Sequence, residues 1–195
     1  MSDTFLTIKS PAEGLFKDKG SKFLAFAYPV KTVDEVKDIV QQKRAEFYDA
    51  RHVCYAYMLG AERKNFRAVD DGEPSSTAGK PILGQINSHQ LTNILVIVVR
   101  YFGGILLGTS GLINAYKEAS AAAITNAEIE EEIVKTSISV KFKYHQLNDI
   151  MRVVKEQDLD VSGQEFGFDE NTITLLVRNS QLDAVSEKIK QILIF

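Results

Sequence analysis

Residues 93–116 read NILVIVVRYFGGILLGTSGLINAY, and this stretch decides the fold. Its first part, 93–102, is an almost unbroken apolar run, which is typical of a central strand covered on both faces. Gly103 and Gly104 follow as a turn, and an alanine-rich helix is predicted to begin near Gly111. A strand, a glycine-rich turn and a helix N-terminus form an arrangement that receives anions, because free N–H groups and the positive end of the helix dipole point outward.

The chain before this stretch predicts two further strands and a helix. SKFLAFAYPV (21–30) and RHVCYAYML (51–59) have the apolar content of strands. Between them, Thr32 and Glu35 have capping-box spacing at the start of a helix with an apolar stripe. Strands and helices are mixed in this part, which favours α+β architecture.

An acidic run at 127–135, AEIEEEIVK, is the best candidate for a junction between domains. The strand that follows, TSISVKFKYH (136–145), alternates apolar and polar residues. A helix, two strands and a second helix are then predicted in the order β-α-β-β-α, a ferredoxin-like split βαβ unit whose last strand is short or missing. We therefore predict two small domains, 1–128 and 129–195.

The composition indicates a soluble cytoplasmic protein. Of the 195 residues, 45% are hydrophobic and 25% charged, and the formal net charge is -3. Neither a signal peptide nor a membrane span is expected, and the only cysteine, Cys54, excludes an internal disulfide. Residues 1–128 hold 15 Lys and Arg against 14 Asp and Glu, and residues 129–195 hold 8 against 12. Such a balance lacks the basic excess of a protein that binds nucleic acid by bulk charge.

A second polar stretch, DDGEPSSTAGKPIL (70–83), combines carboxylates, hydroxyls, glycines and prolines. It is no phosphate-binding P-loop, because six residues separate Gly72 from Gly79 and Pro81 follows Lys80. Its three acids lack the spacing of a calcium loop, and Mg²⁺ binding is the less favoured alternative to solvated side chains. We predict no metal and no cofactor. The hydroxyls of 75–77 are predicted to cap a helix that begins near Lys80.

Histidine and cysteine fall on one face of the strand 51–59. Strand periodicity places His52 and Cys54 together, away from Val53 and Tyr55. We expect Cys54 to be a buried core residue rather than a nucleophile, and His52 to reach the acidic loop. Ligands with the spacing of a zinc site are not found.

Four motifs resemble the signature blocks of the IMPACT/YigZ family. They are GSKF (20–23), DARHVCYAYML (49–59), DDGEPSSTAGKPIL (70–83) and VVRYFGGILLGTSGLINAY (98–116), and the resemblance covers roughly residues 1–128. It implies an N-terminal domain with the βαβ fold of ribosomal protein domain 2, which small-metabolite kinases share. It also implies a ferredoxin-like C-terminal domain, and a link with translation, since eukaryotic relatives regulate an initiation-factor kinase.

Three functional hypotheses follow. The leading one is a non-enzymatic protein that binds RNA or a ribosome-associated partner, with no membrane partner and no DNA-specific motif. The alternative is an enzyme that acts on a small phosphorylated or nucleotide ligand in a cleft between the two polar loops; a third is a scaffold for protein partners. The oligomeric state stays open. The candidate ligand-binding residues are His52, Asp70, Asp71, Glu73, Thr77, Lys80, Arg100, Tyr101, Phe102, Gly103, Gly104, Gly108, Ser110 and Gly111.

Overall fold

The computed structural model describes residues 3–194 except residue 169, and these residues form two compact units. One unit spans Phe5–Glu132, and the other contains the described residues from Ile133 onward together with Asp3 and Thr4. The division at residue 128 into separately folding domains stays a prediction. Strands β1 (Thr4–Ile8) and β7 (Ile129–Ile133), most of whose residues belong to the first unit, pair with each other as a small sheet. The acidic run thus contains a strand that its charges do not predict.

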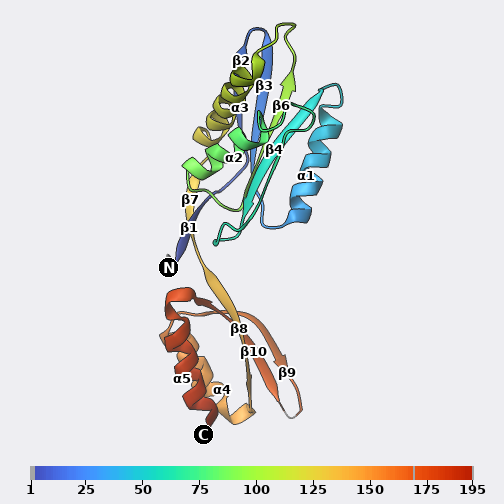
Figure 1. The fold of residues 1–195 in the computed structure, drawn as a ribbon. Helices are drawn as coiled ribbons and strands as arrows, with labels where there is room; N and C mark the ends of the chain where they lie inside the picture. Colours follow the sequence, from blue (N-terminus) through green and yellow to red (C-terminus); the bar gives the residue numbers. More distant parts are fainter. Residues whose placement is uncertain (1–2, 169, 195) are drawn as a thin grey trace. The chain divides into compact units, whose positions relative to one another are not determined.

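A five-stranded sheet is the centre of the first unit, in the order β2-β3-β6-β4-β5 (Figure 1). All neighbouring strands in it are antiparallel. Helix α1 covers one face of the sheet, while α2 and α3 cover the other. The elements are β2 (Ala12–Asp18), β3 (Ser21–Pro29), α1 (Val33–Glu46), β4 (His52–Leu59), β5 (Asn65–Val69), α2 (Gly79–Ser88), β6 (Ile94–Tyr101) and α3 (Gly108–Thr125).

The central position of β6 confirms the prediction from its apolar sequence. Ile94, Val96 and Val98 are completely buried against α2 and α3. The alternate residues, among them Leu95 and Ile97, are equally buried on the α1 face. A strand with two buried faces needs apolar side chains at every position, so no alternation appears in its sequence.

The outer strands β2 and β5 are not evident from the sequence. Side chains of β2 alternate between half-buried and exposed, and four of the five residues of β5 are exposed. Edge strands bury little apolar surface, so their sequences carry polar residues and a weak pattern.

The second unit has the predicted β-α-β-β-α order. Its sheet has the order β8-β10-β9, with antiparallel pairs. Apolar residues of β8 and β10, such as Val140 and Ile173, pack with Ile150 of α4 and Val185 of α5 in a core of their own. The described residues here contain no fourth sheet strand. The elements are β8 (Lys135–Phe142), η1 (Tyr144–Gln146), α4 (Leu147–Glu156), β9 (Asp160–Phe166), β10 (Asn171–Arg178), η2 (Asn179–Gln181) and α5 (Leu182–Ile194).

Of the helices in the described part of the chain, none has the length and apolar character needed to span a membrane.

Two glycines of the first unit give a matched test of its packing. A Cβ atom at Gly14 of β2 would lie 2.3 Å from the backbone nitrogen of Ala123 in α3, whereas a Cβ at Gly84 of α2 meets nothing within 4 Å. Gly14→Ala is therefore expected to lower the free energy of unfolding by about 1–3 kcal/mol through overpacking. Gly84→Ala is expected to raise it by about 0.5–1 kcal/mol, because alanine favours a helix interior.

Denaturant unfolding followed by circular dichroism measures both changes. A Gly14→Ala variant as stable as the unchanged protein would contradict the close contact between β2 and α3.

Candidate functional site

The two polar loops predicted from the sequence lie beside one pocket. We call residues 70–83 the first loop and residues 100–111 the second loop. The pocket has a volume of about 410 Å³. It forms where β6 ends and β4 begins, since His52 is the strand partner of Arg100. Its lining includes Glu73 and Pro74 from the first loop and Phe102 and Leu106 from the second. We call it the site pocket; the residues that line it are Arg51, His52, Glu73, Pro74, Arg100, Phe102, Leu106, Leu107, Gly108, Thr109 and Leu112.

Asp70 holds the first loop and caps helix α2. Its Oδ1 accepts hydrogen bonds from the backbone nitrogens of Ala78 (3.0 Å) and Gly79 (2.8 Å), and its Oδ2 accepts one from Ser76 (2.8 Å). The prediction that hydroxyls of residues 75–77 cap this helix is therefore wrong. The Thr77 hydroxyl instead donates to the Pro74 carbonyl at 2.7 Å, inside the loop. A carboxylate eight or nine residues upstream provides the acceptor that a neighbouring serine usually provides.

The pKa of Asp70 lies below its ordinary value. Partial burial is the largest single influence and raises this pKa. The hydrogen bonds from Ser76, Gly79 and Ala78, with the charge of Lys80, outweigh that effect because they all favour the ionised carboxylate.

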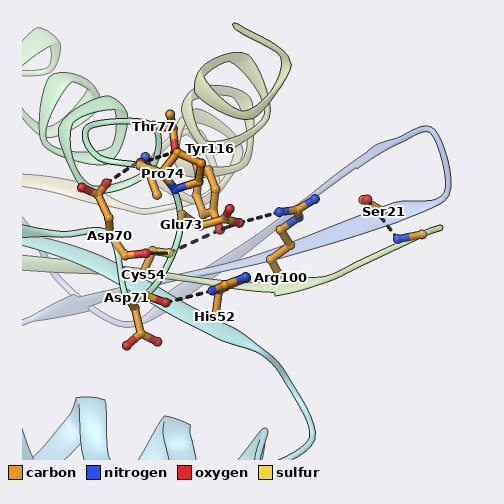
Figure 2. A network of polar contacts seen from close by, with 12 residues as sticks. Ser21, His52, Cys54, Asp70, Asp71, Glu73, Pro74, Thr77, Arg100 and Tyr116 are labelled. Atoms are coloured by element: carbon orange, nitrogen blue, oxygen red, sulfur yellow. Dashed lines mark hydrogen bonds and ion pairs between the residues drawn. The ribbon is translucent and has the colours of Figure 1, made fainter. Parts of the chain in front are cut away.

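Asp71 connects the loop to β4 and α1. It has a left-handed backbone conformation, with φ of 47°. Its Oδ2 accepts from the Val53 backbone nitrogen at 2.7 Å, and its Oδ1 from Arg44 at 2.6 Å. The Asp71 carbonyl oxygen lies 2.8 Å from Nδ1 of His52 (Figure 2). A carbonyl oxygen only accepts, so Nδ1 carries the proton and Nε2 remains available to a ligand.

Four buried residues form a polar network (Figure 2), and two of them, Glu73 and Arg100, are part of the pocket lining. Glu73 Oε1 accepts from Arg100 Nη1 at 2.6 Å and from the Tyr116 hydroxyl at 2.8 Å. The side chains of Arg100 and Glu73 are only 8% and 3% exposed. The Cys54 thiol donates to the Asp70 carbonyl at 2.9 Å and lies 3.3 Å from the Tyr116 hydroxyl. These contacts link the first loop, strands β4 and β6, and helix α3.

Cys54 and Tyr116 are held in their neutral forms. Burial raises the pKa of the Cys54 thiol, and the nearby carboxylates of Glu73, Asp71 and Asp70 raise it further. Burial likewise raises the pKa of the Tyr116 hydroxyl. Because the thiolate is the nucleophilic form, Cys54 is unsuited to covalent catalysis and is a core residue, as its strand position predicts.

Arg100 has unused hydrogen-bond donors. Its Nε atom is buried and has no hydrogen-bond partner among the described residues. The guanidinium carbon lies 5.6 Å from the ring centroid of Phe23 and 5.7 Å from that of Phe102. The Phe102 ring is 52% exposed, so one aromatic neighbour of Arg100 is available to a partner.

The GSKF motif (20–23) packs against the start of the second loop. A Cβ atom at Gly103 would lie 2.0 Å from the carbonyl carbon of Gly20, so the two backbones touch. The Gly103 nitrogen donates to the Ser21 hydroxyl at 3.1 Å (Figure 2). Phe23 then packs edge-on against Tyr116, with ring centroids 5.2 Å apart. These contacts of the motif fix the position of the backbone next to Phe102.

Several predicted site residues do not reach the pocket. Its lining, among the described residues, does not include Lys80, Ser110 or Gly111. Tyr101 donates to Asp49 at 2.7 Å and packs with the core on the α1 face. The remaining predicted residues outside the lining support it from the loops: Asp70, Asp71, Thr77, Gly103 and Gly104.

The candidate residues predicted from the sequence do not include Tyr116 of the buried network or six residues of the lining: Arg51, Pro74, Leu106, Leu107, Thr109 and Leu112. Arg51 was signalled by its place next to His52, and Leu112 and Tyr116 by their spacing on one face of α3. No group of three or more His, Cys, Asp or Glu in the described part of the chain is arranged to hold a metal ion.

Comparison with known proteins gives consistent similarities. The family model described as the Impact N-terminal domain matches residues 19–124. IMPACT family member YigZ of Escherichia coli is 33% identical over 166 residues, covering 84% of this chain and 81% of that protein. An IMPACT family member of Haemophilus influenzae is 30% identical over 176 residues, covering 89% and 84%. A solved crystal structure of a hypothetical protein has a TM-score of 0.78 at 30% identity, covering 98% of this chain and 93% of that one.

The role of Asp70 is tested by Asp70→Asn, which weakens the cap of α2. We expect it to lower the free energy of unfolding by about 0.5–2 kcal/mol at neutral pH. Because the folded-state pKa of Asp70 is lowered, its contribution is fully present above the ordinary pKa of an aspartate and is lost as pH falls through the lower folded value. Acid unfolding should therefore be less steep in the variant. Asp38→Asn, at an exposed acid of α1, is the control and should change neither quantity.

The buried ion pair is tested by a double-mutant cycle. Glu73→Leu and Arg100→Met each leave one buried charge without its partner, and each is expected to lower the free energy of unfolding by about 3–5 kcal/mol. The double variant is expected to recover most of this loss, since no unpaired charge remains. Additive losses in the double variant would show that the two side chains do not stabilise each other.

Proposed function

Because the chain belongs to the IMPACT family, for which the resemblance implies a link with translation, we propose that it is a translation-associated protein that binds single-stranded RNA at the site pocket. One observation carries this proposal: a half-exposed aromatic ring, Phe102, lies at a pocket that also contains Arg51, His52 and Arg100. Unpaired RNA bases are commonly bound by stacking on aromatic side chains, with cationic groups nearby for the phosphates.

The walls of the pocket fit a base better than a phosphate. Leu106, Leu107 and Leu112 give it a mainly apolar surface, and Glu73 is also part of its lining. A phosphate would meet both the apolar wall and the carboxylate, which disfavour its charge. A base is neutral, planar and mainly apolar on its faces, so its burial there costs less free energy. We therefore assign the interior of the pocket to one unstacked base.

The phosphates are assigned to the rim. Arg51 is exposed and is part of the pocket lining. One such cation gives a weak salt dependence, with a slope of roughly -0.7 in a plot of log affinity against log salt concentration. Arg100 is not assigned to a phosphate, because its charge is paired with Glu73.

The pocket volume favours a second candidate, a free nucleotide. About 410 Å³ is within the range of roughly 300–1,000 Å³ that small-ligand sites have. If chemistry takes place there, Nε2 of His52 is the group best suited to proton transfer, because its other ring nitrogen is engaged with the Asp71 carbonyl. Thermal-shift measurements with nucleoside monophosphates test this candidate, since a ligand that binds only the folded protein raises its melting temperature.

The RNA proposal is tested by Phe102→Ala. Loss of a stacked base is worth about 1–3 kcal/mol, so the affinity for single-stranded RNA is expected to fall about 5- to 150-fold. Fluorescence anisotropy with a labelled oligoribonucleotide measures it. Phe66→Ala is the matched control, because Phe66 is 55% exposed, a similar fraction, and lies on β5 outside the pocket lining.

Two results would contradict the proposal. One is the absence of any salt-sensitive binding to single-stranded RNA, and the other is an equal loss of affinity in the Phe102 and Phe66 variants. A rise in melting temperature with mononucleotides but no RNA binding would favour the second candidate.

A further inference from the structure

The hydrogen-bonding state of Arg100 indicates which base the pocket selects. A guanidinium has five N–H donors in a fixed planar fork. Glu73 engages Arg100 through Nη1 only. The Nε atom has no partner among the described residues, and Nη2 lies beside Nε on the edge opposite the contact with Glu73. A buried donor without a partner is costly, so this Nε–Nη2 edge is suited to a ligand with two acceptors.

A neutral pair of acceptors fits this edge better than an oxyanion. The charges of Arg100 and Glu73 already neutralise each other, at a separation of 2.6 Å. A carboxylate or phosphate would add a net negative charge beside the Glu73 carboxylate, in a pocket with leucine walls. Removing such a charge from water costs several kcal/mol, whereas hydrogen-bonding a neutral acceptor does not carry that penalty.

Guanine presents such an acceptor pair. Its O6 and N7 atoms lie side by side, and their bidentate pairing with arginine is the commonest specific contact between a protein and a base. Adenine has a donor, the N6 amino group, in place of O6, and would direct it at the arginine donors. Cytosine has two adjacent acceptors on another edge, but its single ring covers less of the leucine wall and of Phe102.

We infer that the free edge of Arg100 recognises a guanine base in the site pocket, with Phe102 stacked on the ring. This inference rests on the proposed function and narrows it from single-stranded RNA to RNA with an unpaired guanine. Glu73 is then a positioning residue: it fixes the guanidinium plane and leaves the recognising edge free.

The test varies a single base in an otherwise uniform RNA. Labelled oligouridylates carry one central guanine, inosine, 7-deazaguanine, adenine or cytosine, and their affinity for the wild-type protein is measured by fluorescence anisotropy. Inosine keeps O6 and N7, so it is expected to bind like guanine. 7-Deazaguanine lacks N7, and adenine lacks O6, so each is expected to bind about tenfold more weakly. Atom changes in the RNA leave the protein fold untouched.

Arg100→Lys is the corresponding change in the protein. It keeps a positive charge beside Glu73 but removes the planar fork. We expect the ratio of guanine to adenine affinity to fall to about one. Circular dichroism checks that this variant is folded. If it is not, the comparison of guanine with 7-deazaguanine on the wild-type protein decides alone.

The outcomes separate this inference from the proposed function. RNA binding with equal affinities for guanine, 7-deazaguanine and adenine would overturn guanine recognition and leave RNA binding in place. No binding to any RNA would remove the proposed function. In that case, a melting temperature raised by guanosine monophosphate but not by its 7-deaza analogue would support recognition of guanine in a free nucleotide, and equal shifts would overturn it.

Discussion

The buried ion pair between Glu73 and Arg100 is the interaction on which the rest of the site depends. Glu73 belongs to the loop before α2, and Arg100 is the next-to-last residue of β6. An ionised group cannot leave water without a partner, so each residue requires the other at this place. Tyr116 of α3 donates to the same carboxylate oxygen and adds the third element. The position of the pocket is therefore a consequence of charge pairing between segments that are distant in sequence.

Asp70 and Asp71 of the first loop form hydrogen bonds within the protein. The carboxylates of Asp70 and Asp71 together accept five hydrogen bonds from backbone nitrogens and Arg44, so their charges are satisfied within the protein. The Asp71 carbonyl oxygen, in turn, orients His52. Hydrogen-bonded carboxylates of this kind stabilise a loop that contains left-handed residues at Asp71 and Ser76. The loop therefore presents little free negative charge to the pocket, despite its acidic sequence.

The sequence predicted those parts that depend on local patterns. The unbroken apolar run revealed the central strand, the alternation in 51–59 placed His52 and Cys54 on one face, and the second unit followed from its periodicity. The cap of α2 was missed because its acceptor, Asp70, is nine residues before the first residue of the helix, outside any local capping rule. Tyr116 was missed because a tyrosine on an apolar helix face has the pattern of a core residue, and only the fold places its hydroxyl beside Glu73.

Recognition at this pocket does not require a basic surface. A protein that binds nucleic acid by phosphate contacts alone needs many exposed cations, and this chain has a net charge of -3. A pocket that buries one base obtains its affinity from stacking and apolar contact, and its selectivity from a few oriented donors. Glu73 cancels the charge of Arg100 but leaves the directions of its other N–H groups intact. In the proposed complex with guanine, the ion pair thereby converts a cation, which would attract any phosphate, into an oriented donor edge that distinguishes one base from another.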